Sequence, residues 1–155
     1  MKKGIFLHFN SDPNMEASGE VKKVKMQIDA LMKWGIIVDE ICVDKSSTAD
    51  KVIRRLPLFP ANGIGLYKIL KTKQIENCDF IYIRKYIIDI WFLHLLKKIK
   101  KINTKIKIIY EIPTYPYDLE WSRLFDKPLL WKERISRTRL LKYVDRIVTC
   151  LLYTS

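Results

Sequence analysis

The sequence lacks any apolar run that reaches the roughly 18 to 20 residues needed to span a membrane. It also lacks the core of a signal peptide, because only GIFLHF separates Lys2-Lys3 from the first polar residues. No G-x-G-x-x-G and no Walker sequence is present, and we find no internal repeat and no low-complexity tract. These absences predict a cytoplasmic protein without a phosphate-binding glycine motif.

Histidine and cysteine are scarce. His8 and His94 are the only histidines, and Cys42, Cys78 and Cys150 lie far apart in the chain. Because this spacing matches no zinc motif, we predict no metal and no cofactor. An odd number of dispersed cysteines is typical of a reducing compartment. Both histidines are expected to be structural, with His94 buried or half-buried in a helix.

The charge is strongly positive, with 29 Lys and Arg against 17 Asp and Glu and a formal net charge of +12. Such a surface attracts nucleic acid, an anionic membrane or a phosphorylated small molecule. Solvated lysines at a helix end are the simpler explanation of the segment KKIKKINTKIK (97–107), and contact with anionic lipid is the alternative. No aromatic and basic stacking platform accompanies the charge, so nucleic acid is not the expected partner. The lysines assigned to a membrane surface are Lys97, Lys98, Lys100 and Lys101.

Apolar segments of strand and helix type alternate along the chain. The segment from 44 to 60 stays unassigned, with LPLFP (56–60) being a loop or a short edge strand. The alternation predicts an α/β fold, Rossmann-like, with a mostly parallel sheet of about six strands and helices on both faces. Strands are expected at 3–9, 36–43, 78–84, 105–112 and 144–150, and helices at 19–34, over about ten residues after Asn62-Gly63, at 86–101 and at 127–143.

Candidate site residues follow the expected strands, because ligands of open α/β sheets bind beyond the carboxyl ends of the strands. The stretch IYEIPTYPYDLEW (109–121) follows one strand, and its prolines stiffen the backbone. Its tyrosines and acids suit a carbohydrate, and Glu111 offers an acceptor or a general base. Prolines that merely turn the chain and tyrosines that cover the core explain the stretch as well. Gly19 lets backbone approach a phosphate at a helix start, or it simply begins the helix.

Five stretches together resemble the N-terminal half of bacterial family 4 glycosyltransferases of the GT-B type, especially those of capsule and exopolysaccharide assembly. The resemblance covers residues 1–149, and EIPTYPYD is its most specific part. It implies a retaining transfer of sugar from a nucleotide-sugar donor to a glycan or lipid-linked acceptor, peripheral on the inner face of the plasma membrane. It also implies that the donor-binding domain is missing and that this fragment alone is inactive. The stretches are FNSD, SGEVKKVKMQIDALMKWG, CDFIYIRKY, IIYEIPTYPYDLEW and KYVDRIVT.

The resemblance further implies roles for single residues. Ser18 and Gly19 would approach the donor's diphosphate. No catalytic residue is assigned, because the family's E-x7-E pair lies in the second domain and Glu-Ile-Pro-Thr replaces a histidine that many relatives carry. The acceptor side would be lined by Asn10, Arg84, Glu111, Pro113, Thr114, Tyr115 and Tyr117.

Two further interpretations accompany this one. The tail at 150–155 ends in LLYTS, which resembles translated sequencing-adapter read-through and indicates a truncated product. A hypothesis from a different class is a non-catalytic basic α/β module that docks on an anionic membrane or on nucleic acid.

Overall fold

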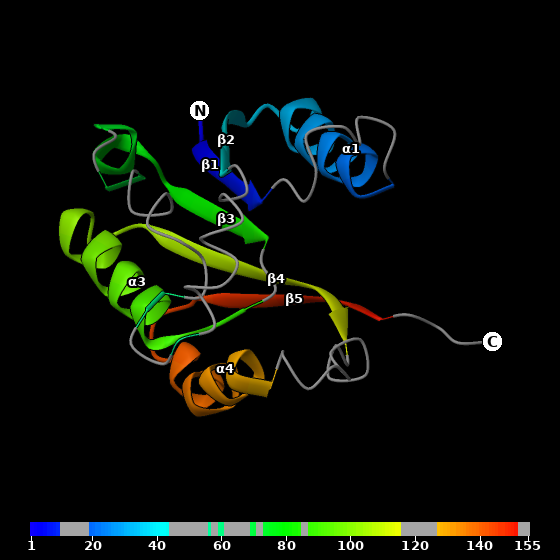
Figure 1. Cartoon of the computed structure of the whole chain (residues 1–155). Helices are drawn as coiled ribbons and strands as arrows, with labels where there is room; N and C mark the ends of the chain where they lie inside the picture. Colours follow the sequence, from blue (N-terminus) through cyan, green and yellow to red (C-terminus); the bar gives the residue numbers. More distant parts are fainter. Residues whose placement is uncertain are drawn as a thin grey trace.

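The computed structural model describes residues 1–9, 19–43, 56, 59–60, 69–70, 73–84, 87–115 and 127–151. Within them, five strands form one parallel sheet in the order β2-β1-β3-β4-β5 (Figure 1). This is the flavodoxin-like order of doubly wound α/β sheets, so the predicted fold class is confirmed. The elements are β1 (Lys3–Phe9), α1 (Gly19–Lys33), β2 (Ile37–Val43), η2 (Lys73–Asn77), β3 (Phe80–Arg84), α3 (Ile90–Ile102), β4 (Lys107–Tyr115), α4 (Lys127–Leu140) and β5 (Arg146–Leu151).

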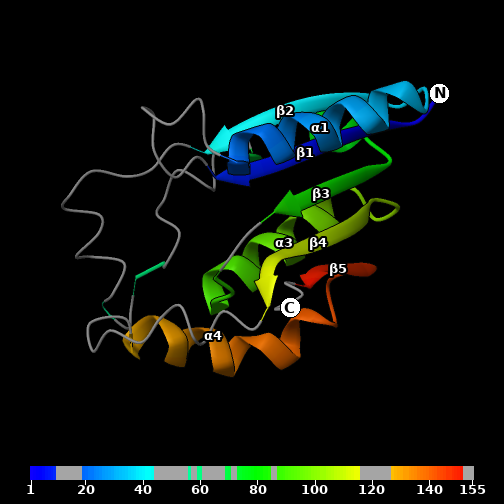
Figure 2. The ribbon, with the colours of Figure 1, turned by 90° about the vertical axis from the view of Figure 1, so that its right-hand side faces the viewer.

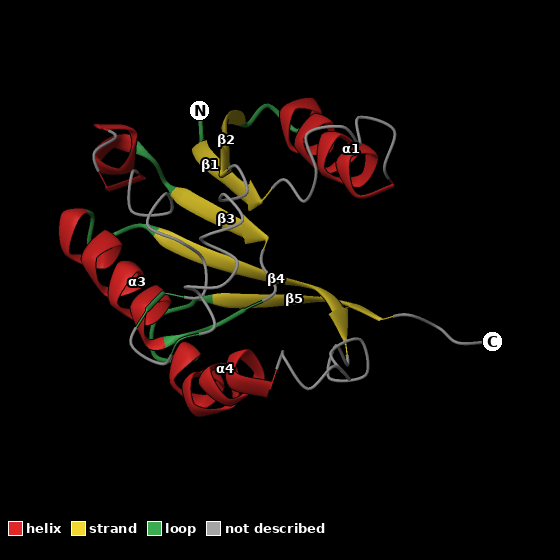
Figure 3. Ribbon diagram, in the orientation of Figure 1, coloured by secondary structure: helices red, strands yellow, loops and turns green. Residues whose placement is uncertain are grey.

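The helices cover the two faces of the sheet unequally. Helices α3 and α4 lie on one face, and α1 is the only described helix on the other face, beside β1 and β2 (Figures 2 and 3). The face under α3 carries the large apolar cluster, which includes Leu7, Ile83 and Tyr110. Among the residues that the structure describes, the cluster under α1 has three buried members, Phe6, Val24 and Ile28.

Helix α1 ends at a glycine, as the sequence predicts. Gly35 has a φ of 74°, in the left-handed region that glycine adopts at low cost. Its N–H bonds to the carbonyl of Met32, and the N–H of Ile36 bonds to the carbonyl of Leu31, which together form a Schellman motif. This motif brings the apolar side chains of Leu31 and Ile36 to the same end of the helix.

Strand β5 is joined to β4 and α3 through one carboxylate. Asp145 accepts bonds from Lys100 Nζ at 2.6 Å, from Lys107 Nζ at 3.2 Å and from the backbone N–H of Ile108 at 2.9 Å. Burial alone raises the pKa of Asp145, but these bonds outweigh it and hold the pKa at about 2. The carboxylate therefore stays charged across the physiological range.

Some expected elements differ from the structure. The sheet has five strands in the described part, where about six were expected. Helix α3 begins at Ile90, not at residue 86, because the Asp89 side chain accepts a bond from Phe92 N at 2.7 Å and caps it. His94 is exposed, not buried. The ten-residue helix after Asn62-Gly63 lies mostly outside the described residues, and residues 73–77 form a 3-10 helix.

Helix α4 also departs from its expected apolar face. The expected core positions included Ile135 and Leu141, which are exposed. The buried side includes Glu133, which accepts two bonds from Arg137, and Lys132, which donates to the carbonyls of Leu56 and Phe59. Burial lowers the pKa of Lys132, against the influence of Asp89. These polar contacts explain why the apolar period of α4 did not identify the buried side.

A first prediction concerns Gly4, which lies under the ring of Phe80. A Cβ atom at Gly4 would overlap this ring, whereas a Cβ atom at Gly19 would meet nothing within 4 Å. We expect Gly4→Ala to lower the free energy of unfolding by about 1–3 kcal/mol, the usual range for overpacking. Urea unfolding measures this, with Gly19→Ala as the control that should be neutral or slightly stabilising. Equal effects of the two substitutions would contradict the close approach.

Candidate functional site

A buried ion pair lies at the carboxyl ends of β3 and β4. Arg84 ends β3, Glu111 is its register partner on β4, and the two side chains are 6% and 1% exposed. Arg84 Nη1 donates to Glu111 Oε1 at 2.6 Å. Both residues were expected to line an acceptor site; they lie at one edge because parallel strands end together, and they bind each other.

Three further side chains surround Glu111. Tyr82 Oη donates to Glu111 Oε2 at 2.9 Å, and Gln27 Nε2 from α1 donates to the same oxygen at 3.1 Å. Lys23 Nζ lies 3.9 Å from Oε1. Burial, followed by the nearby charge of Glu111, raises the pKa of Tyr82 above its usual value, so the phenol stays protonated as a donor.

This arrangement favours a structural role for Glu111. Both of its oxygens accept bonds from donors fixed on the sheet and on α1. Both oxygens are therefore occupied by the protein's own side chains and are not directed at a ligand. The ion pair instead fastens α1 to the carboxyl end of the sheet.

The other residues predicted for the site are only partly placed. Gly19 is the first residue of α1 and is exposed. Pro113, Thr114 and Tyr115 continue β4, whose pairing with β5 shifts between Ile112 and Tyr115, as expected where a proline lacks an N–H. Outside the described residues lie Asn10, Ser18 and Tyr117.

The four lysines assigned to a membrane surface have different surroundings. Lys97, Lys98 and Lys101 are exposed on α3. Lys100 is not available to a surface, because it bonds to Asp145 and to the carbonyl of Ile106. In the part of the chain that the structure describes, no helix has the length and apolar character to cross a membrane.

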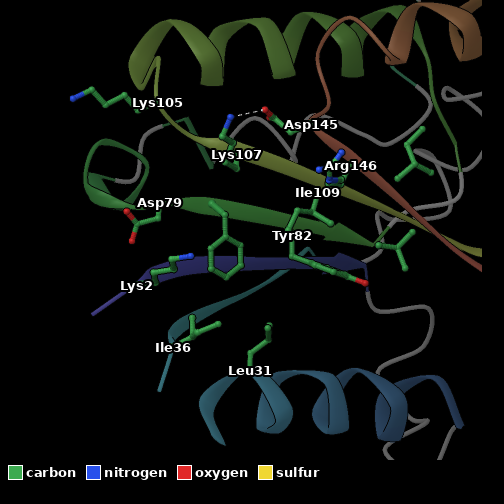
Figure 4. Close-up of a pocket in the computed structure, with 13 residues that line it drawn as sticks. Lys2, Leu31, Ile36, Asp79, Tyr82, Lys105, Lys107, Ile109, Asp145 and Arg146 are labelled. Carbon is green, nitrogen blue, oxygen red and sulfur yellow. Dashed lines mark hydrogen bonds and ion pairs between the residues drawn. The ribbon is translucent and has the colours of Figure 1, made fainter. Parts of the chain in front are cut away.

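An open groove lies on the face of the sheet that carries α1, toward the amino ends of the strands (Figure 4). Its volume is about 990 Å³. Phe80, Tyr82, Ile109 and Val148, from three neighbouring strands, form its apolar floor. Leu31 and Ile36, the two residues brought together by the Schellman motif, form the wall on the α1 side. The groove therefore occupies the part of the sheet that α1 leaves uncovered.

Charged side chains surround the mouth of the groove. The basic ones are Lys2, Lys105, Lys107 and Arg146, and the acidic ones are Asp79 and Asp145. Both acids already have partners, since Asp145 holds Lys100 and Lys107 and Asp79 Oδ2 accepts from the Lys3 backbone N–H at 2.7 Å. The mouth is therefore positive.

The groove lies outside the sites predicted from the sequence, because those sites follow the carboxyl ends of the strands. A usable signal was present. The strands FIYIR and KIIYEIPTY have apolar residues at successive positions, which is typical of strands buried on both faces. Such strands indicate that the face beside α1 also needs a cover.

Among the residues described, no group of three or more His, Cys, Asp and Glu side chains is placed to hold a metal ion. No protein-family model matches the chain, and no curated protein matches it. A solved structure that aligns with it is the response regulator protein TrrA from Thermotoga maritima, in complex with Mg²⁺-BeF. The TM-score is 0.41 and the identity 15%, over 99% of this chain and 90% of that chain. This likeness is too weak to carry an argument about function.

These comparisons correct the expected family. The aligned structure is a response regulator, and nothing found indicates a glycosyltransferase. The expectation of sugar transfer in capsule and polysaccharide synthesis is therefore wrong. The partners expected with it are wrong as well, namely a nucleotide sugar, a glycan or lipid-linked acceptor and an anionic membrane. The donor and acceptor roles of single residues lose their basis with the family.

A second prediction tests the structural role of the ion pair. Glu111→Gln should lower the free energy of unfolding by about 3 kcal/mol, because it leaves the buried Arg84 without its counter-charge. Arg84→Met combined with Glu111→Gln should cost less than the sum of the two single changes, with a coupling of about 1–3 kcal/mol in urea unfolding.

The control for this cycle is the partly exposed pair of Lys3 and Asp39, whose atoms are 3.1 Å apart. Asp39→Asn should cost less than about 1 kcal/mol. Strictly additive costs for Arg84 and Glu111 would show that the pair does not act as a unit.

Proposed function

We propose that this chain is a helix-docking module whose groove binds an amphipathic α-helix of a partner protein. The observation that supports it is the apolar floor of Phe80, Tyr82, Ile109 and Val148, of which Tyr82 packs against the cluster under α1 and the other three belong to neither described cluster. Val148 is 40% exposed although it stands in the sheet. The proposed activity is recognition of an apolar helix face.

The sheet itself supplies the first argument. All its strands are parallel, and parallel sheets occur almost only with both faces covered by helices. One face has α3 and α4 over a large cluster, whereas the other has α1 over a small one. The floor of the groove is therefore an apolar surface that gains free energy when it is removed from water.

The kind of partner follows from the backbone of the floor. Strands β3 and β4 are paired on both sides, so they offer no free hydrogen-bonding edge there. A partner on this face must satisfy its own backbone and contribute apolar side chains, which is what an amphipathic helix does. The outer edge of β5 offers the alternative of strand addition, which a binding experiment can distinguish.

A third prediction tests the docking. The probe is a synthetic peptide of 15 residues, the length of α1, with leucine and isoleucine on one helical face and glutamate beside them. We expect it to bind and to gain helical circular dichroism. Val148→Lys should weaken binding about tenfold or more, equal to about 1.4 kcal/mol, because it places a charge in the apolar floor. Fluorescence anisotropy of the labelled peptide measures this.

The matched control is Ile37→Lys. Ile37 is also a β-branched strand residue, and it is 43% exposed, but it does not line the groove. Binding should change by less than about twofold, because a charge outside the groove meets no apolar contact. Absence of binding, unchanged binding by Val148→Lys, or a gain of strand signal in place of helix signal would each contradict the proposal.

A further inference from the structure

We infer that the docked helix runs antiparallel to the strands, parallel to α1, and carries acidic residues in its last turn. This inference rests on the proposed helix docking and adds the direction and the charge of the partner. It follows from how charge is distributed along the groove.

The cations at the amino end of the groove are available to a ligand. Lys2, Lys105 and Arg146 are exposed, and their side chains form no ion pair with another described residue. Of the two acids that share the mouth, Asp145 is paired with Lys100 and Lys107 and Asp79 accepts from the Lys3 backbone N–H, so the three cations outnumber the remaining negative charge. An anionic group placed there would meet positive charge without displacing an internal pair.

The carboxyl end of the same face has a different electrostatic character. The positive charge of Arg84 is already neutralised by Glu111 at 2.6 Å, and both are buried. Three exposed cations thus lie at the amino end, whereas at the carboxyl end Lys23, 3.9 Å from Glu111 Oε1, adds one positive charge beside the neutralised pair.

This difference in charge favours one direction for a helix bound along the strands. Its C-terminus carries about half a negative charge from aligned peptide dipoles, and acidic residues in the last turn add to it. The favourable direction places that end over Lys105 and Arg146. Helix α1 already runs this way on the same face, because it follows β1 and ends where β2 begins. A second helix beside it, about 8–10 Å away, would complete the layer.

The same charges argue against a second copy of this chain as the occupant. Each of the three described α-helices has basic residues in its last turn, namely Lys33 in α1, Lys100 and Lys101 in α3, and Arg137 and Arg139 in α4. Any of them docked in this direction would bring cations against cations. The net charge of +12 adds to this repulsion. The partner is therefore an acidic helix of a different protein.

A fourth prediction tests the direction with two synthetic peptides of equal composition. Both have the same apolar face, and three glutamates stand in the last turn of one and in the first turn of the other. We expect the peptide with the C-terminal glutamates to bind about tenfold more tightly at low salt, and the difference to shrink as salt screens it. Acidic residues in a first turn stabilise an isolated helix, so peptide helicity alone would give the opposite order.

Variants show which charges decide the preference. Arg146→Glu should lower the preference to about twofold or less, whereas Lys98→Glu, on an exposed position of α3, should leave it unchanged. A nitroxide at the C-terminus of the bound peptide should broaden the NMR amide signals of Lys105 and Arg146 more than that of Arg84. A nitroxide at the N-terminus should do the reverse.

The possible outcomes distinguish an error in the inferred direction from an error in the proposed helix docking. If neither peptide binds, helix docking itself is wrong. If both bind equally, or if the nitroxide pattern is reversed, docking stands and the inferred direction is wrong. If raising the concentration of unlabelled protein displaces the peptides because the chain dimerises at the groove, the occupant is a second copy, and the inferred acidic partner is wrong.

Discussion

Both faces of a parallel sheet have to be removed from water, and most of this structure follows from how the chain meets that constraint. Helices α3 and α4 cover one face over a continuous apolar cluster. On the other face, α1 covers the half beside β1, and its Gln27 and Lys23 reach the ion pair of Arg84 and Glu111. That pair lies at the carboxyl end of the face, and in the described part of the chain an apolar groove remains toward the amino end.

Much of the fold could be predicted from the sequence because local signals and packing agree. The strand at 3–9 and the helix that Gly35 ends are found within a residue of their expected limits. The prediction from sequence and the structure differ where polar contacts determine the limits or the buried side of a helix. Asp89 caps α3 later than its apolar run begins, and Lys132 is buried in α4 because it bonds to backbone carbonyls that lie 73 and 76 residues away in sequence. Such contacts leave no periodic pattern in the sequence from which they could be predicted.

The site was less predictable for a related reason. The sequence placed Arg84 and Glu111 at one edge, and they meet there, but the bonds from Tyr82 and Gln27 that make Glu111 structural come from elements far apart in the chain. The family resemblance rested on five short stretches, of which EIPTYPYD was the most specific, and on their order among the strands, loops and helices. Unrelated doubly wound proteins share that order, because it is set by sheet packing and not by chemistry.

The central claim is that the groove on the α1 face of the sheet binds a partner helix, and NMR of the labelled chain tests it most directly. An acidic amphipathic peptide is titrated into the protein while the backbone and methyl signals are followed. Binding in the groove predicts saturable shifts concentrated at Phe80, Tyr82, Ile109 and Val148, with small shifts on α3 and α4. Shifts that are absent at saturating peptide, or that concentrate on α4, would contradict the account.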